Sequence, residues 1–323
     1  MKHLRNIAAA LLICPVLLAG PAARAADSVT VGTVGSASAN IWPVFIGLKK
    51  GFFEAENLKV DIVYVQSSAN LVQQLAAGSL DITMSTGLVD PIRAVAQKAS
   101  IAIVRLEVQA PPYALVAKSS IKALKDLKGK VISLGGPKDI TQIYVERMLA
   151  PHGIKPGEFD MVFAGATSAR ASALQGGAVD AAILLPPFNF RATAAGFNVL
   201  GLTVDYAPEL PFSGTTVNRN WATKNGPVLQ RILNAHLKSV AWFYDPKNRG
   251  EAVAMMAEAS KIKTEDVEKS YDFFVKGKFF EPSGVLSRTK LNALVSAMQE
   301  LGDLPNPFDT EQLVLAGVTK LGK

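Results

Sequence analysis

The sequence predicts an α/β protein of two lobes, each a mostly parallel sheet flanked by helices and joined to the other by a hinge of two crossings. Short β-branched segments alternate with helical segments from Thr30 to Leu185, which is typical of a parallel sheet covered on both faces. The order of these segments occurs twice. Proline-rich stretches at 109–112 and 207–211 separate the two copies, so we place the crossings there.

The first lobe is expected to begin with a buried strand that ends in the turn Gly35 to Ser38, followed by a helix with Asn40 as its N-cap and Gly51 at its end. Its expected strands are 30–34, 60–65, 82–84 and 100–106, and its expected helices are 42–50, 69–77 and 89–97.

The second lobe repeats this order after the first crossing. Its expected strands are 113–117, 130–134, 159–163 and 181–185, with helices at 140–150 and 168–175. The remaining helices, at 227–243, 250–260, 264–274 and 288–301, are assigned to the first lobe and its outer face. The domain prediction is therefore a leader at 1–25, first lobe at 26–110, second lobe at 111–206 and a return to the first lobe at 207–323, with hinges at 109–112 and 202–211.

A short motif supports the duplication. The segments 75–81 and 174–180 both read as a helix end, a glycine, two residues, an aspartate and then a strand. Glycine at a helix end commonly adopts a positive φ, so Gly78 and Gly177 are predicted to be left-handed C-caps.

The N-terminus has the three parts of a secretory signal peptide. Basic residues precede an apolar run from Ile7 to Leu18, and Ala23-Arg24-Ala25 fits a cleavage site. We expect a mature periplasmic or secreted protein that begins at Ala26. Removing this leader lowers the net charge from +7 to +4 and removes the one cysteine, Cys14. The remaining charge gives no case for nucleic-acid binding, and the mature chain has no thiol for a disulfide, a metal or a nucleophile.

Three segments resemble a known family. They are Trp42-Pro43-x-x-Ile46-Gly47-x-x-x-Gly51-Phe52-Phe53-x-x-x-Asn57-Leu58-x-Val60, Leu75-x-x-Gly78-x-x-Asp81 and Leu124-x-Asp126-Leu127-x-Gly129-Lys130. This combination is similar to the periplasmic solute-binding proteins for nitrate, sulfonate, taurine and thiamine-pyrimidine precursors. The resemblance implies a type II periplasmic-binding-protein fold, and an ABC permease with its ATPase as partners. Asn57 stands where the family usually has glycine, and asparagine tolerates the same left-handed turn.

Ligands of open α/β sheets bind beyond the carboxyl ends of the strands, near helix N-termini. The loops 35–42, 85–90, 135–141 and 186–188 occupy such positions, two in each lobe, and Gln109 lies at the hinge. The candidate ligand-binding residues are Ser36, Asn40, Trp42, Ser85, Thr86, Asp90, Gln109, Gly136, Asp139, Thr141, Pro187 and Phe188.

Most of these residues have a structural alternative. Ser36, Asn40, Asp90, Asp139 and Thr141 could serve only as helix caps. Trp42 and Phe188 could be core residues or walls of the site, and Arg93, Arg105 and Arg170 are interpreted as surface or ion-pair residues. An apolar lining beside two acids favours a small organic ligand, of sulfonate, pyrimidine or carboxylate type, over nitrate.

Two other functions are considered. A pyrimidine synthase of the same fold needs a reactive histidine and a cysteine-rich iron site, but the mature chain has only His152 and His236 and no cysteine. No nucleophile elbow, P-loop or metal-binding histidine pair is found either, so we expect no enzyme activity, no cofactor and no metal site. A ligand-sensing partner of a membrane receptor would use the same clamp. We expect a monomer.

Overall fold

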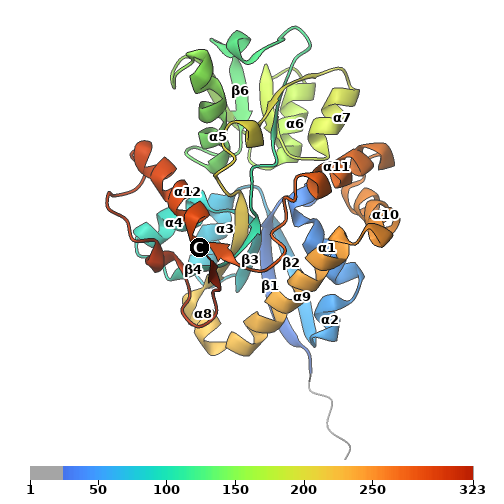
Figure 1. Ribbon diagram of the computed structural model, residues 1–323, viewed down its shortest axis with the longest axis vertical. Helices are drawn as coiled ribbons and strands as arrows, with labels where there is room; N and C mark the ends of the chain where they lie inside the picture. Colours follow the sequence, from blue (N-terminus) through green and yellow to red (C-terminus); the bar gives the residue numbers. More distant parts are fainter. Residues whose placement is uncertain (1–24, 323) are drawn as a thin grey trace, which may run out of the picture.

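The computed structural model describes residues 25–322, so the predicted leader lies almost entirely outside the described residues. The described part forms two lobes, one above the other in Figure 1, each with its own five-stranded sheet. The fold class predicted from the sequence is confirmed.

The sheet of the first lobe has the strand order β2-β1-β3-β10-β4. Strand β1 pairs in parallel with β2 and β3, whereas β10 runs antiparallel between β3 and β4. The strands are β1 Asp27–Val34, β2 Leu58–Val65, β3 Ile82–Gly87, β4 Ile101–Val108 and β10 Ser213–Asn218.

The second lobe has the order β7-β6-β8-β5-β9, which repeats the first topology. Strand β6 pairs in parallel with β7 and β8, and β5 is antiparallel between β8 and β9. The strands are β5 Ala114–Ala117, β6 Val131–Leu134, β7 Asp160–Phe163, β8 Ala181–Leu184 and β9 Asn198–Leu202. In each lobe the antiparallel strand is the one entered directly from the other lobe.

Alternating side chains of the first sheet supply two cores. On β4, Ala102 and Val104 pack with α1, α2 and α9, whereas Ile101 and Ile103 pack on the side of α3 and α4. The helices are α1 Trp42–Lys49, α2 Phe52–Ala55, α3 Ser68–Ala76, α4 Val89–Ala96 and α9 Gly226–Tyr244.

The remaining helices complete both lobes (Figure 1). Helices α5 Ile140–Leu149, α6 Thr167–Gln175 and α7 Phe188–Ala194 belong to the second lobe. Helices α8 Arg219–Lys224, α10 Arg249–Ser260, α11 Thr264–Lys276 and α12 Arg288–Glu300 follow the return to the first lobe. Short 3-10 turns lie at Ala39–Ile41, Leu124–Leu127, Ala150–His152, Thr203–Asp205, Pro246–Asn248 and Thr310–Leu313, and Leu286–Ser287 pairs with Leu321–Gly322 as β11 and β12.

The duplicated motif is confirmed in detail. Gly78 has φ +77° and Gly177 has φ +78°, and both backbone N–H groups donate to the carbonyl three residues earlier at 3.1 Å. The following aspartates also match, because Asp81 accepts from the Thr30 backbone N–H at 3.0 Å and Asp180 from that of Val131 at 3.1 Å. Asn57 has the expected positive φ, +53°.

Parts of the secondary-structure prediction are wrong. Strands β9 and β10 and helices α2, α7 and α8 were not expected. Asn40 lies in the turn Ala39–Ile41 and caps no helix, since its side-chain amide donates to the Ser85 carbonyl at 3.1 Å.

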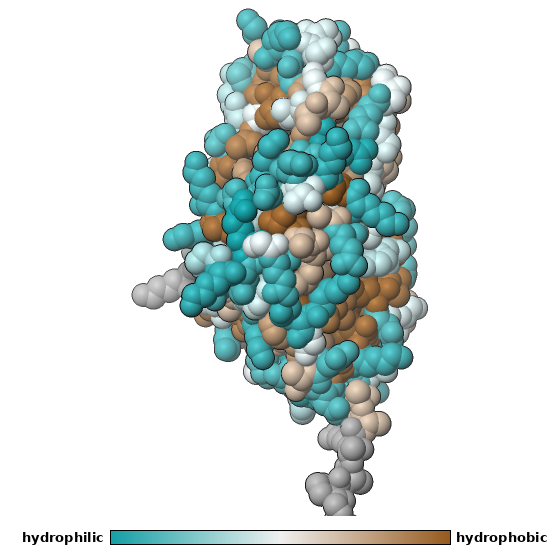
Figure 2. Space-filling view, turned by 90° about the vertical axis from the view of Figure 1, so that its right-hand side faces the viewer, coloured by the Kyte–Doolittle hydropathy of each residue, from teal (hydrophilic) through white to brown (hydrophobic). Residues whose placement is uncertain are grey.

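On the face shown in Figure 2, hydrophobic residues occur in small groups between hydrophilic ones. Among residues 25–322, none of the helices combines the length and the apolar character that a membrane span requires.

Candidate functional site

A cavity of about 470 Å³ lies between the two lobes. Loops at the carboxyl ends of β1, β2, β3, β6 and β7 contribute to it, as open α/β sheets favour. The residues that line it are Val34, Ser38, Asn40, Gln66, Ser67, Ser68, Ala69, Ser85, Gly87, Asp90, Arg93, Tyr113, Gly135, Gly136, Pro137, Asp139, Ile140, Thr141, Phe163, Ala164, Gly165, Ala166, Thr167, Arg170, Leu185 and Phe212.

Six predicted site residues lie on this cavity: Asn40, Ser85, Asp90, Gly136, Asp139 and Thr141. Three come from each lobe, so the structure brings together what the strand-end argument selected. That they contact a ligand stays a prediction.

The other six predicted residues are not among those that line the cavity, and three of them, Trp42, Pro187 and Phe188, are buried in the interior. Trp42 is fully buried against Phe243 and Phe274, with ring centroids 6.2 and 6.1 Å away, so its aromatic surface is already covered. Phe188 begins α7 and packs into the core, and the preceding Pro187 is buried with it.

The last three residues, Ser36, Thr86 and Gln109, also lie outside the lining. Ser36 is exposed to solvent. Thr86 lies between Ser85 and Gly87 on β3 but is fully buried and does not line the cavity. Gln109 is held by the C-terminal part of the chain, because its side chain donates to the Lys278 carbonyl at 2.7 Å.

Ser85 is fixed by a hydrogen-bond cluster beneath the cavity. It has φ +56°, a strained conformation for serine. Its backbone N–H and hydroxyl donate to Glu107 Oε2 at 2.9 and 2.7 Å, and the hydroxyl also lies 2.8 Å from the Asn40 carbonyl. These contacts compensate for the strain and hold Ser85 at the end of β3.

Glu107 is fully buried, and burial raises the pKa of its carboxyl above the ordinary value. Thr215 also donates to it, and His236 Nε2 lies 3.8 Å from Oε2. Burial lowers the pKa of His236 well below its ordinary value, with nearby Arg105 as a second cause. His236 and Arg105 are therefore internal groups, which corrects the interpretation of Arg105 as a surface or ion-pair residue.

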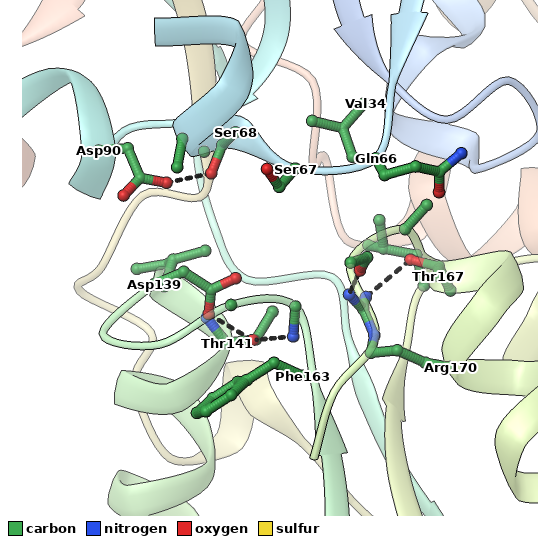
Figure 3. A pocket seen from close by; sticks show the side chains of 18 of the residues that line it. Val34, Gln66, Ser67, Ser68, Asp90, Asp139, Thr141, Phe163, Thr167 and Arg170 are labelled. Carbon is green, nitrogen blue, oxygen red and sulfur yellow. Dashed lines mark hydrogen bonds between the residues drawn. The ribbon is translucent and has the colours of Figure 1, made fainter. Parts of the chain in front are cut away.

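Asp90 and Asp139 face one another from the two lobes (Figure 3). Asp90 is the second residue of α4 and does not cap it. Its carboxylate accepts from the Ser68 hydroxyl and from Arg93 Nη1. Asp139 is the N-cap of α5, as one interpretation of the sequence held, and Oδ1 accepts from the Thr141 and Gln142 backbone N–H groups at 2.9 and 3.2 Å. Burial raises the pKa of Asp139 to about 6, against the opposing effect of the Thr141 hydrogen bond.

Two arginines line the cavity, although the sequence analysis did not select them as ligand-binding residues. Arg93 joins Asp90 and Asp303 in the first lobe to the Lys138 carbonyl of the second, 2.6 Å from Nη2. Arg170 is 3% exposed, and its Nε donates to the Ile183 carbonyl at 2.8 Å. The interpretation as surface or ion-pair residues holds for Arg93 in its ion pairs and is wrong for Arg170.

The loops after β2 and β7 were also missed. Gln66, Ser67 and Ser68 follow β2, and Ala166 and Thr167 follow β7. Both loops open a nine-residue helix, and the first-turn N–H groups of such helices favour a hydrogen-bond acceptor. Applying the strand-end rule to every parallel strand would have found them.

A family model described as "NMT1/THI5 like" matches residues 38–249, about two thirds of the chain. The chain belongs to this family. The match spans the cavity loops of both lobes.

Individual relatives are more distant. The binding protein YtlA of Bacillus subtilis is 23% identical over 283 residues, which cover 84% of this chain and 83% of that protein. The nitrate/nitrite binding protein NrtA of Synechococcus elongatus is 28% identical over 51% of this chain and 37% of that protein.

Solved structures share the fold at low identity. The alkanesulfonate-binding protein SsuA from Xanthomonas axonopodis pv. citri, bound to MOPS, superimposes with a TM-score of 0.74 at 18% identity, covering 93% of this chain and all of that chain. The desulfurization enzyme DSZB has a TM-score of 0.65 at 13% identity, covering 90% of this chain and 97% of that chain. The fold therefore occurs in binding proteins and in at least one enzyme.

Proposed function

We propose that this protein is the solute-binding component of an ABC importer, which captures a small organic ligand between its lobes and delivers it to a permease and its ATPase. The observation that carries the proposal is the cavity itself, to which both lobes contribute polar groups. Several of the relatives and structural neighbours are binding proteins by name, which supports the same role.

The lobes close around the solute by rotation at the two crossings, 109–112 and 202–211. A ligand that contacts both lobes stabilises the closed state, and a ligand that contacts one lobe alone does not. The Arg93 bond to Lys138 and the bond from the Ala39 N–H to the Pro186 carbonyl, at 2.8 Å, join the lobes in this structure, and we expect both to break when the lobes open.

The ligand is of sulfonate, pyrimidine or carboxylate type. Helices α3 and α6 present N–H groups for an acceptor on the ligand, and Tyr113, Phe163 and Phe212 give apolar surface. In the same proposal the protein is an exported monomer cleaved before Ala26 and acts without enzyme activity. Intact-mass measurement of the exported protein tests the cleavage, and retention of residues 1–25 would contradict it.

The binding role is tested by a thermal-shift screen followed by calorimetry. A true ligand at about 100 times its dissociation constant stabilises the folded state by ~2.7 kcal/mol. Gln66→Ala in the first lobe and Phe163→Ala in the second should each weaken binding, since both side chains are exposed on the cavity.

Matched controls lie next to these residues. Tyr64 and Val162 are 45% and 42% exposed on the same strands but are not among the lining residues, so Tyr64→Ser and Val162→Ala should bind normally. If the controls and the cavity variants lose the same affinity, the cavity is not the binding site.

A further inference from the structure

Four charged side chains line the cavity: Asp90 and Arg93 from the first lobe, and Asp139 and Arg170 from the second. The described lining residues include no lysine and no histidine. The charge of the ligand that suits this cavity therefore depends on which of these four side chains already have partners within the protein.

Every nitrogen of both arginines has an oxygen partner. In Arg93, Nε and Nη2 bind Asp303, Nη1 binds Asp90, and Nη2 also binds the Lys138 carbonyl. In Arg170, Nε, Nη1 and Nη2 donate to the Ile183 carbonyl, the Gly165 carbonyl and the Thr167 hydroxyl. Oxygens of the protein therefore accept from four of the five N–H groups of Arg93 and from three of those of Arg170, so neither guanidinium has its whole fork free for an anion.

The two carboxylates differ from one another. Both oxygens of Asp90 are occupied, one by the Ser68 hydroxyl and one by Arg93. In Asp139, only Oδ1 accepts hydrogen bonds from the protein, and Figure 3 shows the other oxygen directed into the space between the lobes. Asp139 has no ion-pair partner within 4.0 Å among residues 25–322, although the charges of Arg170 and Asp90 act on it from farther away.

We infer that the solute carries a protonated amino group, which Asp139 Oδ2 receives in the gap opposite Asp90. This inference rests on the proposed function and narrows its ligand class. An ammonium group supplies the donors that Oδ2 lacks and a positive charge in direct contact, whereas the charge of Arg170 acts on Asp139 without an ion pair. Such charge-assisted hydrogen bonds are the strong ones.

Other features of the cavity agree with a donor on the ligand. Asn40 lines the cavity, and its side-chain Oδ1 is buried without a hydrogen-bond partner in the protein. A simple oxyanion has no donor for Asp139 and would meet its charge with like charge. A hydrogen-bond acceptor elsewhere on the same ligand can bind the backbone N–H groups at the N-termini of α3 and α6.

The test uses two matched sets of probes in calorimetric titrations at pH 7.5. The first set is benzylamine, benzyl alcohol and benzoate, and the second is 2-aminoethanesulfonate, 2-hydroxyethanesulfonate and ethanesulfonate. Within each set, the amine should bind at least about tenfold more tightly than the other members, the size of one charge-assisted hydrogen bond.

The variants assign this preference to a residue. Asp139→Asn retains an N-capping side chain but loses the charge, so it should abolish the preference for the amine. Asp160→Asn changes an exposed aspartate of the same lobe that does not line the cavity, and it should retain the preference.

The inference fails if the amine-free members bind as tightly as the amines, or if Asp139→Asn keeps the preference. In that case the protein is still a solute-binding protein, but its ligand belongs to a class without an amino group. If these probes and the wider screen both give no binding to the wild-type protein, the proposed function fails together with the inference.

Discussion

The guanidinium group of Arg93 donates a hydrogen bond to the backbone carbonyl of Lys138 at 2.6 Å, and this contact joins the two lobes at the cavity. Arg93 lies on α4 of the first lobe, and Lys138 lies in the loop before α5 of the second. The same guanidinium binds Asp90 and Asp303, so three separate parts of the chain meet at one side chain. These two ion pairs offset the effect of burial and leave the pKa of Arg93 above its ordinary value.

Arg93→Lys should weaken ligand binding by about tenfold. Lysine keeps the charge but cannot donate in several directions from one planar group, so the bond between the lobes is lost. Calorimetry with the best compound of the screen measures the change. Arg191→Lys is the control, because Arg191 donates to Gln175 within the second lobe. Equal losses in both variants would show that Arg93 has no special role in closure.

Gly78→Ala and Gly177→Ala should each lower the free energy of unfolding by about 1 kcal/mol. A Cβ at either position meets no atom within 4 Å, so the cost comes from the positive φ alone. Gly250→Ala is the matched control, since its Cβ would also be unobstructed and its φ is not in the left-handed region. Urea denaturation measures the three variants, and an unchanged stability at positions 78 and 177 would contradict the C-cap interpretation.

Asp81→Ala and Asp180→Ala should each destabilise their lobe by about 1–2 kcal/mol, because a backbone N–H of a central strand loses its acceptor. Asp61→Ala removes an exposed aspartate and should have little effect. Hydrogen bonds and an ion pair with Lys118 lower the pKa of Asp180. The contribution of Asp180 to stability is therefore present at neutral pH and is lost as the pH falls through its pKa in the folded protein. If the Asp180→Ala variant had wild-type stability at neutral pH, the hydrogen bond of this carboxylate to the Val131 N–H would not stabilise the lobe.

Asp139→Asn should change how stability depends on pH. The pKa of Asp139 rises from 3.8 in the unfolded chain to about 6 in the folded protein. The folded protein therefore holds a proton that the unfolded chain has released, and the contribution of Asp139 to stability decreases as the pH rises from about 4 to about 6.

The variant lacks this decrease. Above pH 6 we expect it to be more stable than the wild type by about 1–2 kcal/mol, since the carboxylate is in part exposed to the cavity and water there reduces the burial cost. The difference should vanish near pH 4. Thermal or urea denaturation across this range measures it, and a constant difference would contradict the burial of Asp139.

Much of the fold could be predicted because glycine caps and β-branched strands follow local rules. Strand β10 was missed because Ser213, Thr215 and Thr216 are polar, and only the three-dimensional structure shows that they are fully buried between β3 and β4. Helix α7 follows two prolines, which favour a loop in the sequence.

The site was predictable where a side chain follows a parallel strand, as for Asp139 and Thr141. It was not predictable where packing decides the direction of a side chain. Trp42 and Phe188 are equally suited to a core and to a binding wall, and only the neighbours that cover them settle the choice. Arg93 and Arg170 look like surface residues in a helix pattern. The partners of Arg93 include distant parts of the chain, whereas Arg170 is buried against carbonyls and a hydroxyl of its own lobe.

The most direct test of the two-lobed clamp is the distance between the lobes with and without ligand. Arg147 on α5 and Glu300 on α12 form an exposed ion pair at 2.8 Å across the lobes, so spin labels on cysteines at these positions report on closure. Cys14 is replaced by serine, which leaves no other thiol in the chain. With the compound that most raises the melting temperature, the account predicts one narrow distribution at short distance, and longer, broader distances without it. A distribution that is the same in both states would contradict closure of the lobes around a ligand.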